Sequence, residues 1–262
     1  MLQINDLKTY YFKEKKETRA VDGVRLKIPP ASIFALVGES GCGKTTLGLS
    51  ITGLINPKDG RVISGSVIFE GRNILRLTGD ELRNIRGKEI SYIFQEPATS
   101  LNPVFRIGQQ IEEALIVHRV ADRKKAKESA IDSLRVAGLP DTERVFNSFP
   151  HQLSGGMKQR AMIAMAVSTR PKLLIADEPT TALDVDTESR ILDLFVALRK
   201  ELSLSVLIIT HNIRLVKRIA DKAAVMYDGK IVEVDDANKI FDNPKHAYTK
   251  MLLDSLPENI KI

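Results

Sequence analysis

The fold is decided by residues 33–46, Ile-Phe-Ala-Leu-Val-Gly-Glu-Ser-Gly-Cys-Gly-Lys-Thr-Thr. The apolar run at 33–37 predicts a strand buried on both faces of a sheet, and residues 46–54 have the spacing of a helix. Between them, residues 38–45 match the pattern G-x-x-x-x-G-K-[ST] in full. A strand, this loop and a helix in that order predict a P-loop, which cradles the phosphates of a nucleotide.

Each residue type in the loop suits phosphate binding for a physical reason. Glycines let backbone N–H groups converge on phosphate oxygens, and the start of the following helix adds a favourable dipole. We expect Lys44 to neutralise the β- and γ-phosphates and the Thr45 hydroxyl to bind Mg²⁺. A chance glycine-rich turn is the alternative, and the flanking strand and helix argue against it. The expected nucleotide-binding residues of the loop are Gly38, Glu39, Ser40, Gly41, Cys42, Gly43, Lys44, Thr45 and Thr46.

A second element of a phosphate site is Lys-Leu-Leu-Ile-Ala-Asp-Glu-Pro at residues 172–179. Its apolar part predicts a strand that delivers two acids at its carboxyl end, where ligands of parallel sheets bind. Asp177 can hold Mg²⁺ through water, and Glu178 can polarise an attacking water as a general base. Acids at strand ends are also common solvated groups, so the P-loop earlier in the chain is what favours the catalytic interpretation.

A third element is Leu-Ser-Gly-Gly-Met-Lys-Gln-Arg at residues 153–160. Ser154 has the character of an N-cap for a helix that runs to residue 169. Gly155 and Gly156 are poor helix formers, each costing about 1 kcal/mol against alanine, which is easier to understand if a ligand approaches this backbone closely. Bare N–H groups at a helix start form an anion site. The chain therefore has two expected phosphate-binding helix starts, although one nucleotide needs only one.

Short β-rich segments alternate with helical ones over much of the chain, which predicts an α/β architecture. Residues 24–28 and 66–70 alternate between polar and apolar, which predicts a more exposed antiparallel part. Between about residues 97 and 170 the strand signals stop, which predicts a helical insert. Asp228-Gly229 predicts a hairpin turn near the end of the chain. The helices of the insert are expected at residues 107–118, 124–137 and 155–169.

The composition is that of an ordinary globular protein, with 43% hydrophobic and 27% charged residues among 262. The net charge of +6 raises nucleic acid as a partner, but acids are interleaved with the bases, so solvated surface is the preferred interpretation. Cys42 is the single cysteine, which excludes an internal disulfide and an all-cysteine metal site. We find no signal-peptide pattern at the start and no apolar run of roughly 18 residues. Contact with a membrane is therefore expected only through another chain.

The three motifs, in this order, resemble those of the ATP-binding subunits of ABC transporters. In that family two subunits enclose two ATP molecules head to tail, each between the P-loop of one chain and the Leu-Ser-Gly-Gly stretch of the other. The resemblance implies an α/β fold of P-loop NTPase (ABC-type), with a parallel sheet, an antiparallel β subdomain and a helical insert. It implies ATP and Mg²⁺ as cofactors. It also implies an ATP-binding core at 1–96 and 171–235, a helical subdomain at 97–170 and a short C-terminal extension at 236–262.

The resemblance assigns roles to further residues. Gln95 matches the glutamine that contacts Mg²⁺ and the hydrolytic water, and His211 matches the histidine that contacts the γ-phosphate. Tyr11 is the chosen aromatic for stacking on adenine, with Tyr10 and Phe12 left open. The expected catalytic residues are Glu178, His211, Gln95 and Lys44, and the expected metal-binding residues are Thr45, Gln95 and Asp177. The expected residues facing the other chain's nucleotide are Ser154, Gly155, Gly156 and Met157. Residues 182–184, Ala-Leu-Asp, resemble the family's D-loop, which couples the two sites across the dimer, and Asp184 is the expected nucleotide-site residue of that loop.

Three stretches narrow the resemblance to the peptide and nickel importer branch: residues 94–103, 149–153 and 240–249. That branch often uses two different ATPase subunits. Met157 with residues 161–166 is similar to the first of the two types, which implies a heterodimer, with a homodimer as the alternative. Some members carry a four-cysteine iron–sulfur site in a longer C-terminal region, and with only Cys42 present we expect no cluster.

The partners implied are a second ABC ATPase subunit, two transmembrane permease subunits and, indirectly, an extracytoplasmic solute-binding protein. The resemblance implies that the protein is located at the cytoplasmic face of the cell membrane, and no nucleic acid is expected to bind. The alternative function is a soluble ABC-type ATPase in DNA repair or translation. Repair members usually carry long coiled-coil or zinc insertions and translation members carry two cassettes, and this sequence has neither. A P-loop GTPase is disfavoured because no Asn-Lys-x-Asp stretch is present.

Overall fold

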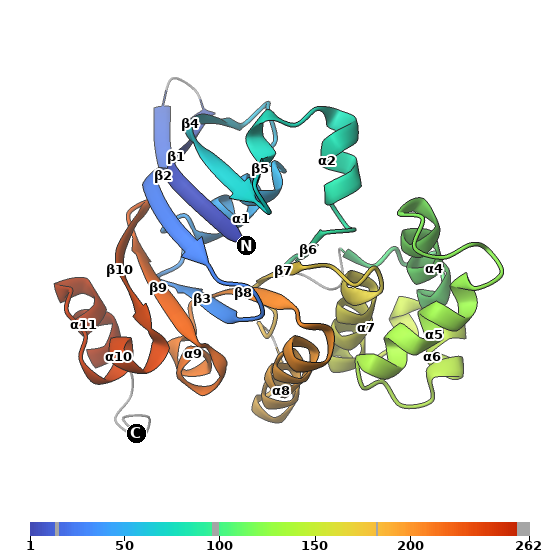
Figure 1. Cartoon of the computed structure of the whole chain (residues 1–262). Coiled ribbons are helices and arrows are strands. Elements are labelled where there is room, and N and C mark those ends of the chain that lie inside the picture. Colours follow the sequence, from blue (N-terminus) through green and yellow to red (C-terminus); the bar gives the residue numbers. More distant parts are fainter. Residues whose placement is uncertain (14–15, 96–99, 182, 256–262) are drawn as a thin grey trace. The chain divides into compact units, whose positions relative to one another are not determined.

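The computed structural model describes residues 1–13, 16–95, 100–181 and 183–255, without the side chains of residues 214–216. The chain divides into two compact units (Figure 1). Unit 1 consists of Met1–Leu82 and Leu207–Ile262, and unit 2 consists of Arg83–Val206. Helix α2 (Gly79–Ile85) and strand β8 (Ser205–Thr210) contain the two points at which the chain passes from one unit to the other.

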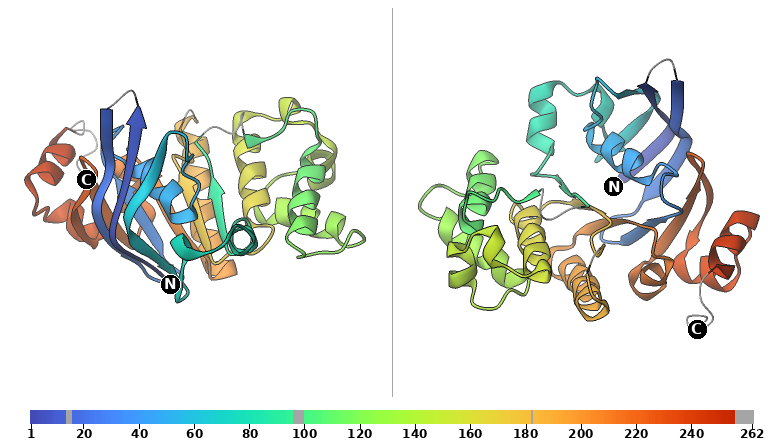
Figure 2. Two further views of the ribbon diagram at one scale, coloured as in Figure 1. Left: turned by 90° about the horizontal axis from the view of Figure 1, so that it is seen from above. Right: turned by 180° about the vertical axis from the view of Figure 1, so that it is seen from behind.

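Unit 1 contains an antiparallel sheet with the strand order β2-β1-β4-β5, and its three long strands run side by side in Figures 1 and 2. Its first strand buries Leu2, Ile4 and Leu7 among more exposed neighbours, as expected when one face of a strand covers a core. A shift in the register with β2 between Ile4 and Leu7 brings Leu7 to the buried face, and further shifts follow between Leu7 and Lys8 and between Thr9 and Tyr11. The strands are β1 (Leu2–Lys13), β2 (Lys16–Ile28), β4 (Gly60–Phe69) and β5 (Arg72–Asn73), and the 3₁₀ helix η1 (Ile74–Arg76) follows them.

The second sheet region of unit 1 has the strand order β10-β9-β3-β8. Strand β3 (Ile33–Val37) is buried at every residue and pairs in parallel with β9 (Lys222–Tyr227), whereas β9 pairs antiparallel with β10 (Lys230–Asp236). A continuous apolar strand needs cover on both faces. The helices of this unit are α1 (Lys44–Thr52), α9 (Ile213–Ile219), α10 (Ala237–Asp242) and α11 (Ala247–Asp254).

In unit 2, β6 (Ile90–Ile93) pairs in parallel with β7 (Leu173–Asp177), so the carboxyl ends of the two strands lie next to each other. The remaining elements are helical, and α4, α5, α6 and α7 cluster together (Figure 2). They are α4 (Ile107–Val117), α5 (Ala126–Val136), α6 (Thr142–Asn147), η2 (Pro150–Gln152), α7 (Gly155–Val167) and α8 (Val185–Leu202).

The helices of unit 2 form because their apolar residues recur at helical spacing. In α4, Ile107, Ile111 and Leu115 are four residues apart and at most 1% exposed, so they share one buried face. Each such side chain contributes about 1.5–3 kcal/mol by leaving water. Gly108 on the same helix lets the ring of Phe146 from α6 approach closely, because a side chain at this position would overlap that ring.

The α/β fold expected from the sequence is confirmed, with parallel strands, an antiparallel sheet and a helical segment. Asp228 and Gly229 form the expected hairpin turn, with φ of 43° and 75°, and two positive φ values are typical of a turn that matches strand twist. Ser154 caps α7 as expected, since its side chain accepts from the N–H of Met157. Across the part of the chain that the structure describes, we find no helix with the length and apolarity needed to cross a membrane.

Candidate nucleotide-binding site

The P-loop in unit 1 connects the end of β3 to the first residue of α1. Gly43 has a φ of 109°, and a side chain there would overlap the carbonyl oxygen of Ala20. Gly41 also has a positive φ, 83°, and no described atom lies within 4 Å of where its Cβ would be. Gly43 is therefore required by close packing, while Gly41 leaves open space over the loop, as expected if a ligand is to approach this backbone.

Lys44 lies inside the loop rather than on the surface. It is 5% exposed, and its Nζ donates to the carbonyl oxygens of Gly38 and Glu39, each at 2.8 Å. The loop thus wraps around a positive charge at the start of α1, where the helix dipole is also positive. Both features favour an anion, so the residues present fit a nucleotide phosphate. Thr45 is exposed beside Lys44, where its hydroxyl can serve a cation held on that phosphate.

Cys42 in the same loop is 9% exposed. Burial raises the pKa of its thiol, and the positive charge of Lys44 opposes that shift. The neutral thiol is therefore favoured at neutral pH, and it acts as a small apolar side chain in the loop.

The three candidate aromatics on β1 have different surroundings. Tyr10 is 8% exposed, donates from its hydroxyl to Asp22 Oδ1 at 2.8 Å and has the Arg19 guanidinium 5.5 Å from its ring centroid. Tyr11 is half-buried, with its ring packed against the position of Gly60. Phe12 is 39% exposed.

A polar hollow of about 610 Å³ lies within unit 1, beside the P-loop. Loop residues Glu39 to Cys42 form one wall, and Thr18 to Ala20 and Asp22 of β2 form another. Tyr10 contacts Arg19 and Asp22, so this aromatic reaches the second wall of the hollow.

In unit 2 the expected acids lie at the carboxyl end of β7: Asp177 is its last residue and Glu178 follows it. Asp177 is 2% exposed and accepts a hydrogen bond from the Tyr92 hydroxyl at 2.9 Å. Glu178 has a φ of 49°, which is uncommon for a residue with a side chain and costs of order 1 kcal/mol or more. Its Oε2 accepts from the Thr181 hydroxyl at 2.8 Å. Gln95 is exposed just beyond β6, the parallel neighbour of β7, so the three expected residues follow adjacent strand ends.

The start of α7 lies beside the start of α8, both in unit 2. Ser154 is exposed, and its Oγ accepts from the Met157 N–H at 3.3 Å. A side chain at Gly156 would come within 2.7 Å of the Thr187 methyl group, whereas one at Gly155 would meet Leu183 at 3.8 Å. Packing against Thr187 therefore requires a glycine at position 156, which the sequence did not reveal. Packing does not require a glycine at position 155, because Leu183 leaves room for a side chain there.

Asp184 caps α8. Its carboxylate accepts from the Thr187 N–H at 2.9 Å and from the Thr187 hydroxyl at 2.8 Å. These bonds, the backbone one first, lower the pKa of Asp184. The neighbouring Ala182, the residues 96–99 within the stretch that follows Gln95, and residues 256–262 of the expected C-terminal extension lie outside the described residues.

His211 follows β8 in unit 1 and is exposed. Strand β8 is the neighbour of β3, so His211 and the P-loop come from adjacent strands of one unit. Among the described residues, no group of three or more His, Cys, Asp and Glu side chains could hold a metal ion together. Within unit 1, the exposed Thr45 hydroxyl beside Lys44 suits an ion that keeps most of its contacts to phosphate and water, as Mg²⁺ does.

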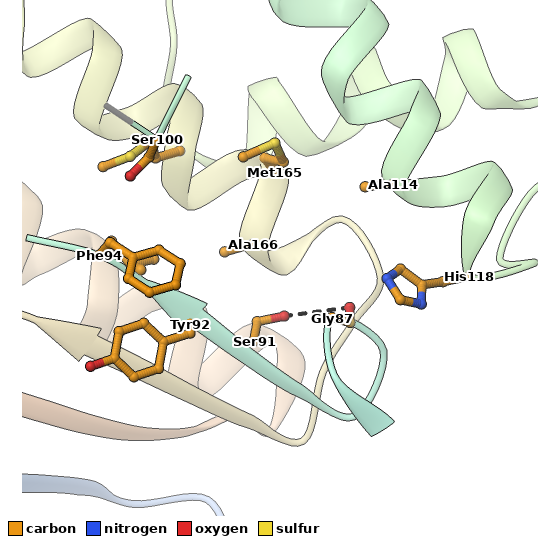
Figure 3. A pocket seen from close by; sticks show the side chains of 11 residues that line it. Gly87, Ser91, Tyr92, Phe94, Ser100, Ala114, His118, Met165 and Ala166 are labelled. Atoms are coloured by element: carbon orange, nitrogen blue, oxygen red, sulfur yellow. Dashed lines mark hydrogen bonds between the residues drawn. The ribbon is translucent and has the colours of Figure 1, made fainter. Parts of the chain in front are cut away.

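Unit 2 also contains an apolar cavity of about 600 Å³, lined by β6, α4 and α7 (Figure 3). Phe94 is 45% exposed at this cavity, and its ring centroid lies 4.7 Å from that of Tyr92. Met165 of α7 faces it as well. His118 packs over Gly87, and burial and the charge of Lys88 lower its pKa.

Sequence reasoning missed two contacts. The Tyr92 hydroxyl that binds Asp177 and the Tyr248 hydroxyl that accepts from the P-loop N–H of Glu39, at 3.2 Å, join residues far apart in the chain. No local pattern of residues predicts either contact. Each tyrosine lies in a strand or helix whose apolar spacing already explains why a tyrosine is found there.

Comparison with known proteins identifies the family. The family model described as ABC transporter matches residues 21–181, and the one described as oligopeptide/dipeptide transporter, C-terminal region, matches residues 232–261. The chain is 46% identical over 257 residues to the oligopeptide transport ATP-binding protein AppD of Bacillus subtilis, covering 98% of this chain and 78% of that protein. It is 44% identical over 258 residues to the dipeptide transport ATP-binding protein DppD of Escherichia coli, covering 98% and 79%.

Solved structures agree with this assignment. A dimeric post-hydrolysis structure of the ATP-binding cassette MJ0796, bound to ADP and Pi, matches with a TM-score of 0.80 and 28% identity, covering 90% of this chain and 99% of that one. The cbiO1 protein of Clostridium perfringens matches with a TM-score of 0.78 and 26% identity, covering 92% and 90%. This chain belongs to the ABC transporter family, as its motifs indicated, and it is an ATPase of that family.

Proposed function

We propose that this chain is an ATP-hydrolysing subunit that drives import of dipeptides or oligopeptides, working at the cytoplasmic face of the cell membrane. The observation that carries the ATPase role is the buried Lys44 ammonium, enclosed by the P-loop at the start of α1. The peptide cargo is supported by the names of the relatives and by the match of residues 232–261 to the transporter C-terminal region. Nickel or another small solute is the alternative cargo.

The residues of unit 1 bind the triphosphate. Lys44 neutralises the β- and γ-phosphates, and the backbone N–H groups of the loop donate to their oxygens. Thr45, with Gln95 and Asp177, holds Mg²⁺, which when bound neutralises charge on the phosphate oxygens. An aromatic of β1 stacks on adenine, with Tyr11 as the first choice.

Hydrolysis uses the residues that follow β6, β7 and β8. Glu178 orients and polarises the attacking water, and its strained backbone, braced by Thr181, fixes the direction of its carboxylate. Gln95 contacts the water, and His211 contacts the γ-phosphate. Asp177, whose orientation is set by the Tyr92 hydroxyl, stays in reach of the metal.

A second ATPase subunit completes each site. Ser154 to Met157 at the start of α7 face the nucleotide of the partner chain, and Asp184 lies at the same edge of unit 2. The dimeric state of the MJ0796 cassette supports this arrangement. The partner is a related subunit in a heterodimer, as the residues around Met157 indicate, and a homodimer is the alternative.

The helical region 97–170 is the part proposed to contact two permease subunits, while residues 1–96 and 171–235 form the ATP-binding core and 236–262 the extension. Support comes from the apolar cavity with its exposed Phe94, since exposed apolar patches mark interaction surfaces (Figure 3). A solute-binding protein outside the membrane would select the cargo. None of the relatives described above is a repair or translation protein, so that alternative has no support.

Replacing Glu178 by glutamine tests the ATPase role. The variant should bind ATP but hydrolyse it at least about a hundredfold more slowly, because the general base is removed while the phosphate-binding loop is intact. Glu201→Gln, an exposed change at the far end of α8, is the matched control and should behave as the wild type. Wild-type turnover by Glu178→Gln would remove Glu178 from this role, and unchanged ATP binding by Lys44→Ala, measured by calorimetry, would contradict the P-loop assignment.

The cargo is tested separately in a reconstituted complex with the permease subunits and the binding protein. Peptide added with the binding protein should stimulate ATP hydrolysis, whereas a nickel salt should not. Stimulation by nickel alone would replace the proposed cargo and leave the ATPase role unchanged.

A further inference from the structure

The C-terminal helix of unit 1 contacts the P-loop through one side chain. Tyr248 lies in the second position of α11 and is 6% exposed, and its hydroxyl oxygen accepts a hydrogen bond from the Glu39 backbone N–H at 3.2 Å. The two residues are 209 positions apart in the chain. The contact joins the region that matches the transporter C-terminal model to the loop that surrounds Lys44.

The bonded N–H belongs to the same peptide unit as a carbonyl that holds Lys44. The Gly38 carbonyl and the Glu39 N–H share one planar, trans peptide, so they point in opposite directions and rotate together. Lys44 Nζ donates to the Gly38 oxygen at 2.8 Å on one side, and Tyr248 accepts from the Glu39 N–H on the other. The orientation of this peptide therefore depends on both contacts.

Tyr248 is itself held in place from several directions. Its ring centroid lies 4.2 Å from that of Tyr227, and it packs in an apolar cluster with Val37, the residue just before the loop. The turn after Tyr227 reaches the loop again, since the Gly229 N–H donates to the Cys42 carbonyl at 3.0 Å. The loop is thus braced at Glu39 and at Cys42 by segments from the C-terminal part of the chain.

The start of α11 is anchored to β10 by Glu233. One carboxylate oxygen of Glu233 accepts from the Lys245 N–H at 2.9 Å, and the other accepts from the His246 N–H at 3.0 Å. The His246 ring then accepts from the Tyr248 N–H at 3.2 Å. Together these bonds hold the start of α11, and with it the backbone of Tyr248, in place.

We propose that Tyr248 is a positioning residue for ATP binding: by accepting from the Glu39 N–H it sets the Gly38–Glu39 peptide, which in turn holds the Lys44 ammonium. The inference rests on the proposed function, in which Lys44 binds the triphosphate. Without the hydroxyl, the Glu39 N–H loses its protein partner in a part-buried position, and the peptide is free to rotate its carbonyl away from Lys44. The C-terminal region then affects nucleotide affinity without touching the nucleotide.

The test is Tyr248→Phe in the full chain, because this change removes the hydroxyl and keeps the ring on Tyr227. The KM for ATP, measured on the chain assembled with its partner subunit, should rise about three- to tenfold while kcat stays within about twofold, since the change loosens the loop that binds the triphosphate in the ground state and leaves Lys44 itself in place. A purely structural role would instead lower the melting temperature and the active fraction with KM unchanged. Lys250→Ala, an exposed change on the same helix, is the control and should leave both constants unchanged.

Amide hydrogen exchange gives a second readout that needs no activity. The Glu39 amide should exchange at least about tenfold faster in Tyr248→Phe than in the wild type, because its acceptor is gone. Glu233→Gln, which keeps the Tyr248 hydroxyl but weakens its anchor, should shift KM and exchange in the same direction by a smaller factor. This variant carries the test if Tyr248→Phe does not fold.

Wild-type KM together with wild-type exchange of Glu39 in both variants overturns the inference, and so does a loss of kcat at unchanged KM. If the wild-type chain, assembled with its partner ATPase subunit, hydrolyses no ATP, the proposed function fails. The exchange of Glu39 still decides in that case whether Tyr248 holds the loop.

Discussion

Replacing Gly155 by alanine tests whether this glycine is needed for packing at the start of α7 or for ligand binding there. The nearest described atom to an added Cβ is Leu183 Cδ2 at 3.8 Å, an ordinary van der Waals distance. Alanine is favoured over glycine in a helix by about 0.5–1 kcal/mol, and less at the first helical position. The variant should therefore be as stable as the wild type, or up to about 3 °C more stable in Tm.

The effect on hydrolysis should have the opposite sign. If the first N–H groups of α7 contact the nucleotide of a partner chain, an extra methyl group limits how closely the phosphate can approach them. Removing one donor to developing charge costs about 10²–10³ in rate in other enzymes, and a partial obstruction should cost at least about tenfold, or about 1.4 kcal/mol. The ATPase rate of the assembled subunits, measured at saturating ATP, reports this loss.

Two other glycines make the comparison interpretable. Gly79 is also the first residue of a helix, α2, and no described atom outside that helix and its chain neighbours lies within 4 Å of its Cβ position, so Gly79→Ala should leave the rate unchanged and the stability equal or slightly higher. Gly156→Ala should destabilise the fold by about 1–3 kcal/mol, because its Cβ would come within 2.7 Å of the Thr187 methyl group. A Gly155→Ala variant that hydrolyses ATP within twofold of the wild-type rate would refute the idea that this helix start contacts a nucleotide.

Two further predictions concern single titratable groups. Burial raises the pKa of Cys42, so alkylation by N-ethylmaleimide, followed by mass spectrometry, should be slow at pH 7, faster at pH 9 and slowed by ATP. The alkylated chain should not bind ATP, because the added group takes up space in the P-loop, and normal ATP binding by that chain would contradict this. The pKa of His118 is lowered by burial and by Lys88, so the folded state binds its proton less readily than the unfolded state. The stability of the fold should therefore decrease as the pH decreases from about 6.5 through the lowered pKa. In a scan from pH 7.5 to 5, the Tm of His118→Gln should decrease less than the Tm of the wild type. Equal decreases in Tm would exclude His118 as the cause.

The features that could be predicted from the sequence are those carried by neighbouring residues. The P-loop, the strand before Asp177 and the cap at Ser154 depend on short-range patterns: an apolar run, a glycine that leaves room, or a hydroxyl that reaches an N–H three residues on. The Asp228-Gly229 turn is of the same kind, because its two positive φ values belong to the turn itself. Local chemistry predicts these features because the residues that determine them are neighbours in the chain.

The choice among the aromatics of β1 shows where local rules stop. Alternation along a strand would put Tyr11 on the face of Thr9, whose hydroxyl bonds Ser50 of α1 at 2.8 Å. The register changes between Thr9 and Tyr11, and an irregularity of this kind re-aims the side chains that follow it. This irregularity arises from the pairing of β1 with β2, so it cannot be predicted from the sequence of β1 alone.

Gly156 shows a second way in which sequence reasoning falls short. Both glycines of α7 have the same cost in a helix, so a single explanation by ligand approach looked sufficient for the pair. The structure divides them, because the Thr187 methyl group lies over Gly156 while Gly155 remains exposed. Only Gly155 still needs a ligand to explain its lack of a side chain.

Each unit contains a backbone segment whose conformation depends on contacts with side chains and not on local conformational preference alone. In unit 2, Glu178 keeps a left-handed backbone while Thr181 bonds its carboxylate. In unit 1, the Gly38–Glu39 peptide is held between Lys44 and Tyr248. In the proposed function, the Glu178 carboxylate held in this way needs no reorganisation when charge develops during phosphoryl transfer. The Gly38–Glu39 peptide needs none when the triphosphate binds. This is why each unit also uses one residue outside the motifs, Thr181 or Tyr248: a loop proposed to leave N–H groups available to a phosphate is held in part by side chains from elsewhere.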